Sequence, residues 1–440
     1  MSPLLFILIL SAINLYRGNS HLRKPNQVGD VIRDTHGYLH SHIFKGSIPA
    51  RSSRTDLVDR SPLSADHSHE LVFVIRQKNM DLLERILNDI SNPSNPSYGQ
   101  HLSAEQISAI TTNPDARNAI VAFLHTSGAT ISSEGRSGDS INAIAPISIW
   151  ENVLDTTFHS FHQRQHNGNV VQFVRAEKYS IPKELDMHLA AVLRTVDIPV
   201  VRPGASIFPE EEAKHVGKVN GHLLALYDGI TTAQNLRSYY SIGDATGSSA
   251  STQTAVSFGE SYLSERSLAY FQRNMSFQPL QRALNFGGYL SEDPSLFYLE
   301  PNLDMEFIMA ISPVSPTTFW HTGHGFETMV TELLNANNPP YVISISYGHD
   351  ESSYPADAHY FLTTMAIKLC AMGRTFVVAS GDDGANSWKV GLSIGECGYD
   401  PSFPASNPYF TAVGGTAVSA VTHCALVVRN LTALCCVIAS

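Results

Sequence analysis

Two acidic residues one helical turn apart are well placed in this sequence for acid–base chemistry. They are Glu300 and Asp304, within the stretch YLEPNLDMEFIM that begins at Tyr298. Residues four apart lie near one face of a helix. Two carboxylates on a half-buried face can hold a proton between them, as a general base acting at acidic pH requires. The alternative is structural, because acidic residues also favour the N-terminal turn of any helix.

The sequence around this pair predicts a helix over residues 300–311. Pro301 suits its first turn, where the missing N–H costs nothing. The apolar residues that recur at helical spacing are Leu303, Phe307 and Ile311. Asp304 shares its face with Ile308, so we expect its carboxylate to point inward. Glu306 falls on the opposite side and is expected to be an ordinary solvated charge.

From residue 229 onward, apolar strand-like runs alternate with helical segments. Strands are predicted at 255–259, 341–346 and 375–379, and helices at 300–311, 326–334 and 360–372. Such alternation implies an α/β fold with a doubly wound parallel sheet, covered on both faces by helices. Chemistry in these sheets collects at the carboxyl ends of the strands. The stretch Ser380-Gly381-Asp382 directly follows one of them, although Asp382 can also be a turn or capping residue there.

The region before residue 204 reads as a separate, smaller α+β domain that spans 66–203. Its predicted elements are a strand at 70–75, a helix at 80–87, turns at 92–99, a helix starting at Ser103, a strand at 170–174 and a helical pattern at 182–193. Residues 21–65 are polar and are expected to be an irregular lead-in. Residues 204–228 contain Pro209 and a run of three glutamates and resemble an exposed linker.

Composition and charge restrict the function classes. The net charge of −11 argues against nucleic acid or an anionic membrane as a partner. The uncharged run from Leu4 to Leu15 predicts a secretory signal over residues 1–20, with cleavage after Ser20. No other stretch reaches about 18 uninterrupted apolar residues, so no transmembrane helix is expected. Asn274 and Asn430 begin glycosylation sequons.

The five cysteines all lie in the C-terminal third of the chain. They are Cys370, Cys397, Cys424, Cys435 and Cys436. In an oxidising compartment an odd number leaves at least one thiol unpaired or paired between chains, and the pairing stays open. None of them has the spacing of a zinc site with histidine.

Histidines are distributed unevenly along the sequence. Of the 19, 14 precede Gly229, whereas residues 229–440 carry a net charge of −9 from 8 basic and 17 acidic residues. Lowering the pH through about 6.5 therefore charges mainly the N-terminal part. This asymmetry suits an inhibitory domain that is released on acidification. The alternative is that these histidines are scattered surface residues.

Several motifs in order resemble the sedolisin, or serine-carboxyl peptidase, family, and are most similar to its tripeptidyl-peptidase members. In the N-terminal region the match includes LVFVIRQ from Leu71 and PSYG from Pro96. In the C-terminal region it includes Glu300-x-x-x-Asp304, SISYG from Ser344, ASGD ending at Asp382, FPASNPY from Phe403 and VGGT from Val413. The resemblance covers both regions and ends near residue 418.

The resemblance implies a subtilisin-like peptidase domain over 229–440, preceded by a ferredoxin-like activation prodomain of the pro-kumamolisin type. By it, Glu300 is the general base for a serine nucleophile, Asp304 orients Glu300, and Asp382 lines the oxyanion hole. Protonated Asp382 could donate to an oxyanion only at acidic pH or with a raised pKa. The implied partners are peptide or protein substrates and the prodomain as inhibitor. Cleavage in the linker and a lysosomal or extracellular location follow, with exo- or endopeptidase specificity left open.

The sequence also departs from the family pattern. The family nucleophile lies in a Gly-Thr-Ser motif, which this sequence lacks; Gly415-Thr416-Ala417 is an earlier strand motif and Ser419 is no substitute. The family's calcium site is also missing, so no metal ligands are assigned. These departures predict a truncated or alternatively joined product that is inactive and poorly stable when expressed alone. A non-catalytic decoy or prodomain carrier is the alternative.

A histidine-dependent subtilisin-type protease is a third possibility. It is disfavoured because neither His321 nor His324 lies in a subtilisin-like motif. The stretch from His321 to Gly325 reads instead as a glycine-rich loop.

Overall fold

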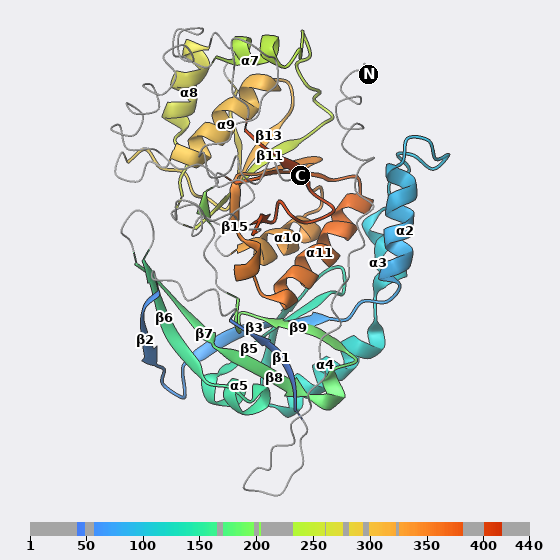
Figure 1. Ribbon diagram of the computed structural model, residues 1–440, viewed down its shortest axis with the longest axis vertical. Coiled ribbons are helices and arrows are strands. Elements are labelled where there is room, and N and C mark those ends of the chain that lie inside the picture. The colour runs from blue at the N-terminus through green and yellow to red at the C-terminus, as the bar shows by residue number, and fades with distance from the viewer. Residues whose placement is uncertain are drawn as a thin grey trace, which may run out of the picture.

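The computed structural model describes residues 42–48, 57–164, 170–197, 202–203, 232–259, 261–275, 281–293, 299–322, 325–381 and 400–415. The predicted signal, the whole of the predicted linker and the C-terminal 25 residues therefore lie outside the described residues. Figure 1 shows an N-terminal sheet at one end of the molecule, helices α10 and α11 in the middle, and helices α7, α8 and α9 at the other end.

The N-terminal region is built on a four-stranded antiparallel sheet in the order β4-β5-β3-β9. Its elements are β3 (Ser68–Ile75), α2 (Met80–Ser91), α3 (Ala104–Thr111), α4 (Pro114–Thr126), β4 (Thr130–Glu134), β5 (Ser140–Pro146), α5 (Ile147–Leu154) and β9 (Leu189–Leu193). In this order two βα units interleave, so that the first strand lies between the third and the last. That is the ferredoxin-like arrangement expected for this region.

Two smaller sheets flank this domain. Strands β1 (His42–Ser47) and β8 (Lys178–Pro182) form one, and β2 (Leu57–Pro62), β6 (Phe158–Arg164) and β7 (Val170–Ala176) form the other. The expectation that residues 21–65 are irregular is therefore wrong for β1 and β2. Both strands are held by long-range antiparallel pairing, which a polar local sequence does not reveal.

The helical pattern predicted at 182–193 is also wrong. Only a single 3₁₀ turn, η3 (Lys183–Leu185), forms there, and β9 follows it. In β9, residues Leu189, Ala191 and Leu193 are buried because β9 pairs with β3 along one edge of the sheet. Tertiary pairing overrides the local periodicity here.

The C-terminal region contains a six-stranded parallel sheet in the order β12-β13-β11-β14-β16-β18. Its elements are α7 (Ala233–Tyr239), β11 (Gln253–Phe258), α8 (Glu265–Asn274), β12 (Leu284–Phe286), α9 (Leu299–Ile311), β13 (Thr317–Thr322), α10 (Gly325–Asn335), β14 (Val342–Ile345), α11 (Ala356–Ala371), β16 (Thr375–Ala379) and β18 (Thr411–Val413). The predicted doubly wound parallel sheet is confirmed. The strand order reverses between β11 and β14, which makes their carboxyl ends the switch point of the sheet.

A second, antiparallel sheet continues from the carboxyl end of β14. It consists of β10 (Arg202–Pro203), β15 (Tyr347–Asp350) and β17 (Ser402–Phe403), in the order β10-β15-β17. A single 3₁₀ turn, η5 (Glu351–Ser353), follows β15 and leads towards α11. Ser346 is the single residue between β14 and β15, so the chain passes from one sheet to the other at this position.

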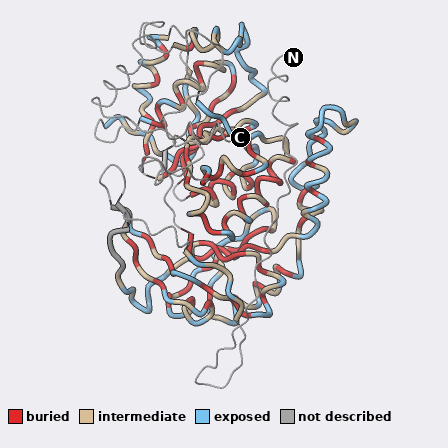
Figure 2. Tube along the Cα trace, in the orientation of Figure 1, coloured by how far each residue is buried: buried red, intermediate tan, exposed pale blue. Residues whose placement is uncertain are grey.

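Helices cover both faces of the parallel sheet. Helices α10 and α11 pack on one face through residues such as Phe326, Leu333 and Phe361. Helices α8 and α9 pack on the other face, where Met305 and Met309 contact the strand residues around Phe319. Burial is concentrated along the sheet and the helix faces turned towards it (Figure 2). This covering on both sides explains why all six residues of β11 are buried.

Strand β3 contributes to the cores of both regions. Leu71 and Phe73 point into the N-terminal core, whereas Val72 and Val74 pack into the core around α10 and α11. This follows from the two-residue period of a strand. The N-terminal sheet therefore covers the outer side of α10 and α11, as the ribbon also shows (Figure 1).

A buried ion pair crosses the same interface. The Lys368 ammonium on α11 lies 3.6 Å from an Asp139 carboxylate oxygen, and both side chains are almost fully buried. Lys368 also donates to the Gln77 side-chain oxygen at 2.7 Å. Removing both charges from water costs free energy that offsets much of their attraction. We therefore expect the ion pair to contribute more to the specificity of docking between the two regions than to its strength.

Candidate active site

Helix α9 begins at Leu299 and ends at Ile311, close to the predicted bounds, with Pro301 in its first turn. Its buried face differs from the prediction. Leu303 is 37% exposed, whereas Met305 and Met309 are buried against the sheet. The apolar stripe seen in the sequence does not face the sheet, because Phe307 packs sideways on Phe271 of α8, with ring centroids 5.1 Å apart.

Asn302 fixes the first turn of α9 to the loop that follows β11. It is almost completely buried. Its side-chain oxygen accepts from the Ser264 backbone N–H at 3.0 Å, and its amide nitrogen donates to the Tyr262 carbonyl at 3.2 Å. Asn302 lies between the two acids, so these bonds also set the position of both carboxylates. A polar residue in a first turn gave no such signal in the sequence.

The two acids lie on this turn in a largely water-excluded environment. Glu300 is buried, with 8% of its surface exposed. One Asp304 carboxylate oxygen accepts from the Ser346 hydroxyl at 2.9 Å. Its other oxygen is buried without a hydrogen-bond partner. The expectation that Asp304 points inward is therefore confirmed.

Burial raises the pKa of Asp304 to about 6, although the hydrogen bond from Ser346 opposes this shift. A carboxyl of this kind holds its proton in weakly acidic solution, where an exposed aspartate would already be ionised. No cation contributes to the pKa shift of Asp304 among the described residues. The site is therefore an acid pair in a low-dielectric, hydroxyl-lined setting.

Glu306 does not behave as the solvated charge expected from the sequence. It is partly buried and accepts from the Ser267 hydroxyl of α8 at 2.9 Å. Burial raises its pKa, and the hydrogen bond from Ser267 opposes that change. Helix α8 packs along this side of α9, so there is no fully solvated face at Glu306.

Hydroxyl side chains gather at the switch point of the sheet. The Ser257 hydroxyl at the end of β11 lies 3.0 Å from the Tyr347 hydroxyl at the start of β15. It also lies 2.5 Å from the Ser261 hydroxyl, which donates to the Phe258 carbonyl at 2.8 Å. Burial and the charges of Asp304 and Glu300 raise the pKa of Tyr347, so this phenol is neutral. Tyr347 therefore lies within electrostatic reach of the acid pair.

Asp382 lies outside the described residues, and the chain leading to it is described only as far as Gly381. Strand β16 is a neighbour of β14, and the Ser380 backbone N–H donates to the Val413 carbonyl at 2.9 Å. Gly381 has a φ of +86°, in the left-handed region that favours glycine. The chain turns sharply at this point, at the same edge of the sheet as Ser346.

His321 is held in place by ring stacking and by one hydrogen bond of its side chain. It is buried, and its ring stacks on Tyr289 with centroids 3.5 Å apart. Its Nε2 lies 2.5 Å from the Gly259 carbonyl, and burial lowers its pKa. His324 lies outside the described residues.

The remaining candidate residues are only partly covered by the structure. Cys370 is a free, partly buried thiol, and burial raises its pKa to about 12; the other four cysteines lie outside the described residues. Asn274 is exposed at the end of α8, and Asn430 lies outside the described residues.

The calcium site that the family resemblance implies is not assigned to any of the described residues. They include no group of three or more acidic, histidine or cysteine side chains that could hold a metal ion. The described part of the chain also has no helix long and apolar enough to cross a membrane.

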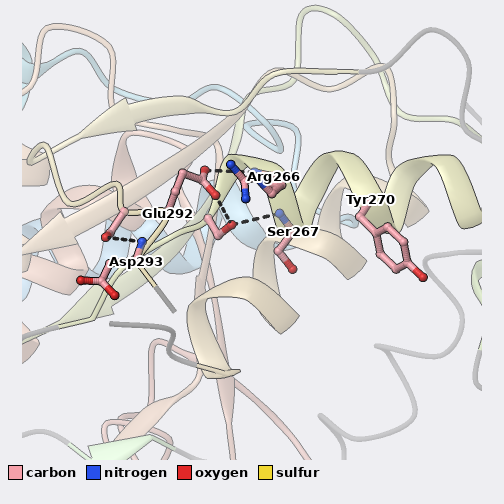
Figure 3. Close-up of a pocket in the computed structure, with 7 residues that line it drawn as sticks. Arg266, Ser267, Tyr270, Glu292 and Asp293 are labelled. Atoms are coloured by element: carbon pink, nitrogen blue, oxygen red, sulfur yellow. Dashed lines mark hydrogen bonds between the residues drawn. The ribbon is translucent and has the colours of Figure 1, made fainter. Parts of the chain in front are cut away.

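A hollow of about 350 Å³ lies beside α9, at the start of α8 (Figure 3). Its lining residues are Ser264, Arg266, Ser267, Tyr270, Ser291, Glu292 and Asp293. The Glu292 carboxylate accepts from the Arg266 backbone N–H at 3.1 Å and from the Ser264 hydroxyl at 2.8 Å. These bonds cap the N-terminus of α8. The hollow is therefore explained as a helix cap rather than a second reaction centre.

Comparison with known proteins identifies similar sequences for most of the chain. A family model described as "Pro-kumamolisin, activation domain" matches residues 55–198. Tripeptidyl-peptidase 1 of Homo sapiens is 28% identical over 373 residues, covering 80% of this chain and 62% of the relative. Probable tripeptidyl-peptidase SED3 of Trichophyton verrucosum (strain HKI 0517) is 26% identical over 402 residues, covering 82% of this chain and 64% of the relative. The chain thus spans less than two thirds of the length of either relative.

A solved structure of Pseudomonas sedolisin, a serine-carboxyl proteinase complexed with two molecules of pseudo-iodotyrostatin, is a weaker match. It is 20% identical, with a TM-score of 0.35, and the match covers 43% of this chain and 54% of that one. At this score the structural alignment adds nothing to the comparison of sequences.

Proposed function

We propose that the chain is a member of the sedolisin family and a precursor of an acid-acting serine-type peptidase, since it is similar to tripeptidyl-peptidase 1 and matches the activation-domain model over residues 55–198. The observation that carries this proposal is the buried pair on α9. Glu300 and Asp304 lie one turn apart at the switch point of a parallel sheet, and Ser346 holds one oxygen of Asp304. Parallel sheets place their chemistry at this point.

The proposed reaction uses three carboxyl groups. Ionised Glu300 accepts the proton of a serine hydroxyl as that oxygen attacks the peptide carbonyl, and returns it to the leaving amine. Asp304 orients Glu300 and carries a proton that it can share with it. Protonated Asp382 donates to the oxyanion of the tetrahedral intermediate. Carboxylates suit this work in an acidic compartment, where a histidine base would already be charged.

The 440-residue sequence contains no Gly-Thr-Ser motif for the nucleophile. We therefore propose that this sequence performs no peptide hydrolysis by itself. Adding a family segment that carries the motif is expected to give acid-dependent release of tripeptides from a fluorogenic reporter. Glu300→Gln in the extended chain should abolish that release, whereas Glu292→Gln, at the α8 cap, should retain most of it. Acid-dependent hydrolysis by the 440-residue chain, lost in Glu300→Gln, would overturn the proposed inactivity.

The rest of the proposed organisation follows the same family frame. Residues 66–203 act as an inhibitory activation prodomain, 204–228 carry the activation cleavage, and 229–440 form the peptidase region. A protein of this kind would travel the secretory pathway to a lysosome or the cell exterior, with glycosylation at Asn274 and Asn430. Treatment with an endoglycosidase that removes N-linked glycans tests the last point, since loss of mass must disappear in Asn274→Gln and Asn430→Gln variants.

A second candidate function is non-catalytic. The N-terminal sheet covers α10 and α11 through apolar contacts and the buried Lys368–Asp139 pair. A chain that keeps this docking without a nucleophile could carry its prodomain to an active homologue, or bind substrates as a decoy. Inhibition of an active tripeptidyl-peptidase by the 440-residue chain at nanomolar concentration would favour this reading; no inhibition at micromolar concentration would reject it.

A further inference from the structure

We propose that Ser346 is a positioning residue for Asp304 of the acid pair, and that the hydroxyls of Ser257 and Ser261 hold the neighbouring Tyr347 in place. This inference deepens the proposed function and rests on it. It concerns how the carboxyl groups are kept in working order, and it assigns roles to hydroxyl side chains rather than to a further acid or base.

Ser346 is placed by the change of sheet at its own position. Strand β14 ends at Ile345, where it pairs with Val256 of β11 and Val378 of β16. Strand β15 begins at Tyr347 in the other sheet. The backbone on both sides of Ser346 is therefore held by different partners. Its hydroxyl donates to Asp304 at 2.9 Å, and no other hydrogen-bond donor to this carboxylate is found among the described residues.

Tyr347 is held by packing and by hydrogen bonds. Tyr347 is buried, with only 3% of its surface exposed. Its ring packs edge to face on Phe258, with the ring centroids 5.1 Å apart. Each serine hydroxyl has one hydrogen to donate. Ser261 uses its hydrogen on the Phe258 carbonyl, so Ser257 must donate to Ser261, and Tyr347 must donate to Ser257.

This direction has a chemical consequence. Because the Tyr347 hydrogen is committed to Ser257, its oxygen can offer only lone pairs to other groups. The Tyr347 hydroxyl is bonded to Ser257 and not to Asp304, since one Asp304 oxygen accepts from Ser346 and the other has no hydrogen-bond partner. Tyr347 therefore holds the chain in place beside Ser346, whereas the donor Ser346 favours the ionised form of Asp304.

Hydroxyls are better suited to this task than cations. A lysine or arginine beside Asp304 would stabilise the carboxylate and drive its proton off even in weak acid. Among the described residues, burial and Ser346 are what determine the proton affinity of Asp304. The charged or titratable groups that face one another here are Glu300 and Asp304 on α9 and Tyr347 on β15. The proton can then stay on the pair across the acidic range.

The test is a carboxyl titration of the full 440-residue chain. With ¹³Cγ-labelled aspartate, the Asp304 signal is assigned by its loss in Asp304→Asn and followed from pH 3 to pH 8. Its midpoint is expected near 6. Ser346→Ala should raise the midpoint by about one pH unit, a tenfold change in proton affinity, and Ser346→Thr should restore it. Tyr347→Phe should leave the midpoint close to that of the parent, because the Tyr347 hydroxyl has no hydrogen bond to Asp304.

Two further variants make the test specific. Ser257→Ala removes the hydrogen bond to Tyr347 and should likewise leave the Asp304 midpoint close to that of the parent. Ser267→Ala removes a hydroxyl that donates to Glu306 on the same helix at 2.9 Å, and should leave Asp304 unchanged. An unchanged Asp304 midpoint in folded Ser346→Ala, or a shift in Ser346→Thr as large as in Ser346→Ala, would overturn the inference. The titration needs no hydrolysis, so it can fail while the peptidase proposal stands, and the reverse also holds.

Discussion

Acidification is expected to destabilise the N-terminal region through His69. This residue lies on β3, and its Nε2–H donates to the Arg194 carbonyl at 3.0 Å. Burial lowers its pKa from 6.5 to about 4, and the charges of Arg175 and Arg194 act in the same direction, while Asp197 opposes them. Its ring also packs edge to face on Phe158 at 5.4 Å. A protonated His69 would be a third cation in this cluster.

The direction and magnitude of the change in stability follow from the pKa values of His69 in the unfolded and folded states. A histidine with a depressed folded-state pKa stabilises the fold above pH 6.5, and this stability is lost as the pH falls towards 4. At about 1.36 kcal/mol per pH unit, the loss is roughly 2 kcal/mol at pH 5 and about 3 kcal/mol below pH 4. Because His69 keeps some exposure to solvent, these values are upper bounds. Even so, they are a substantial fraction of a typical net folding stability of about 5–15 kcal/mol.

The assay uses a reporter in direct contact with the histidine. The Trp150 indole donates to the His69 carbonyl at 2.8 Å, so its fluorescence follows unfolding of this domain. In a Trp320→Phe/Trp388→Phe background, urea midpoints are measured at pH 7 and pH 5. His69→Gln keeps a donor for the Arg194 carbonyl but cannot be charged, so it should lose most of the pH dependence. His125→Gln, at an exposed position of α4, is the matched control. An equal pH slope in His69→Gln and its parent would refute the reasoning.

The carboxyl groups at the interface between the two regions have the opposite effect on stability to His69 when the pH falls. Burial raises the pKa of Glu327, and the charge of Asp197 adds to this. Burial raises the pKa of Asp357 to about 6, although its hydrogen bond from Tyr179 opposes the shift. Groups with raised pKa values stabilise the docked state most at low pH and lose this effect as the pH rises. Release in acid, if driven by histidine, therefore begins with loosening of the N-terminal domain rather than with repulsion at the interface.

Three further outcomes are expected. Asp357→Asn should remove about 2 kcal/mol of the stability that the docked chain gains between pH 7 and pH 4. Thermal unfolding at both pH values measures this, and an unchanged gain contradicts the prediction. Lys368→Met leaves Asp139 buried and unpaired and should destabilise docking by about 3–5 kcal/mol, measured by urea unfolding, with Lys368→Met/Asp139→Asn recovering much of the loss. Asn302→Ala should cost about 1–3 kcal/mol and increase hydrogen exchange at residues 261–264, whereas exchange confined to its own helix would count against the proposed anchor.

The sequence predicted those parts of the fold that are encoded by local pattern. Helix α9 was predicted within a residue of its start because Pro301 marks the first turn. The apolar run of β16 and the alternation of strands with helices predicted a parallel sheet, which is confirmed. Strand β9 was missed because its pairing with β3 joins residues more than a hundred positions apart. Local periodicity cannot report such a contact.

In the candidate site, too, the features set by local sequence were predicted and those set by tertiary contacts were not. The spacing of Glu300 and Asp304 placed both acids on one helix face, and the inward direction of Asp304 followed from its apolar neighbours. The prediction of a solvated Glu306 was wrong because helix α8, which lies earlier in the chain, covers that side of α9. The role of Ser346 was invisible, since it depends on β14 lying beside β11 and on the change of sheet that follows.

The acidic range of the proposed reaction follows from where the proton resides in this site. Below about pH 6 Asp304 is mainly protonated, so the two acids on α9 carry at most one negative charge between them. Above that pH both carboxyl groups would be ionised on one buried face, where repulsion and desolvation disfavour a second charge. Ser346 moderates the effect without supplying a charge of its own. The same burial that raises the pKa of Asp304 therefore favours the proposed chemistry in acid.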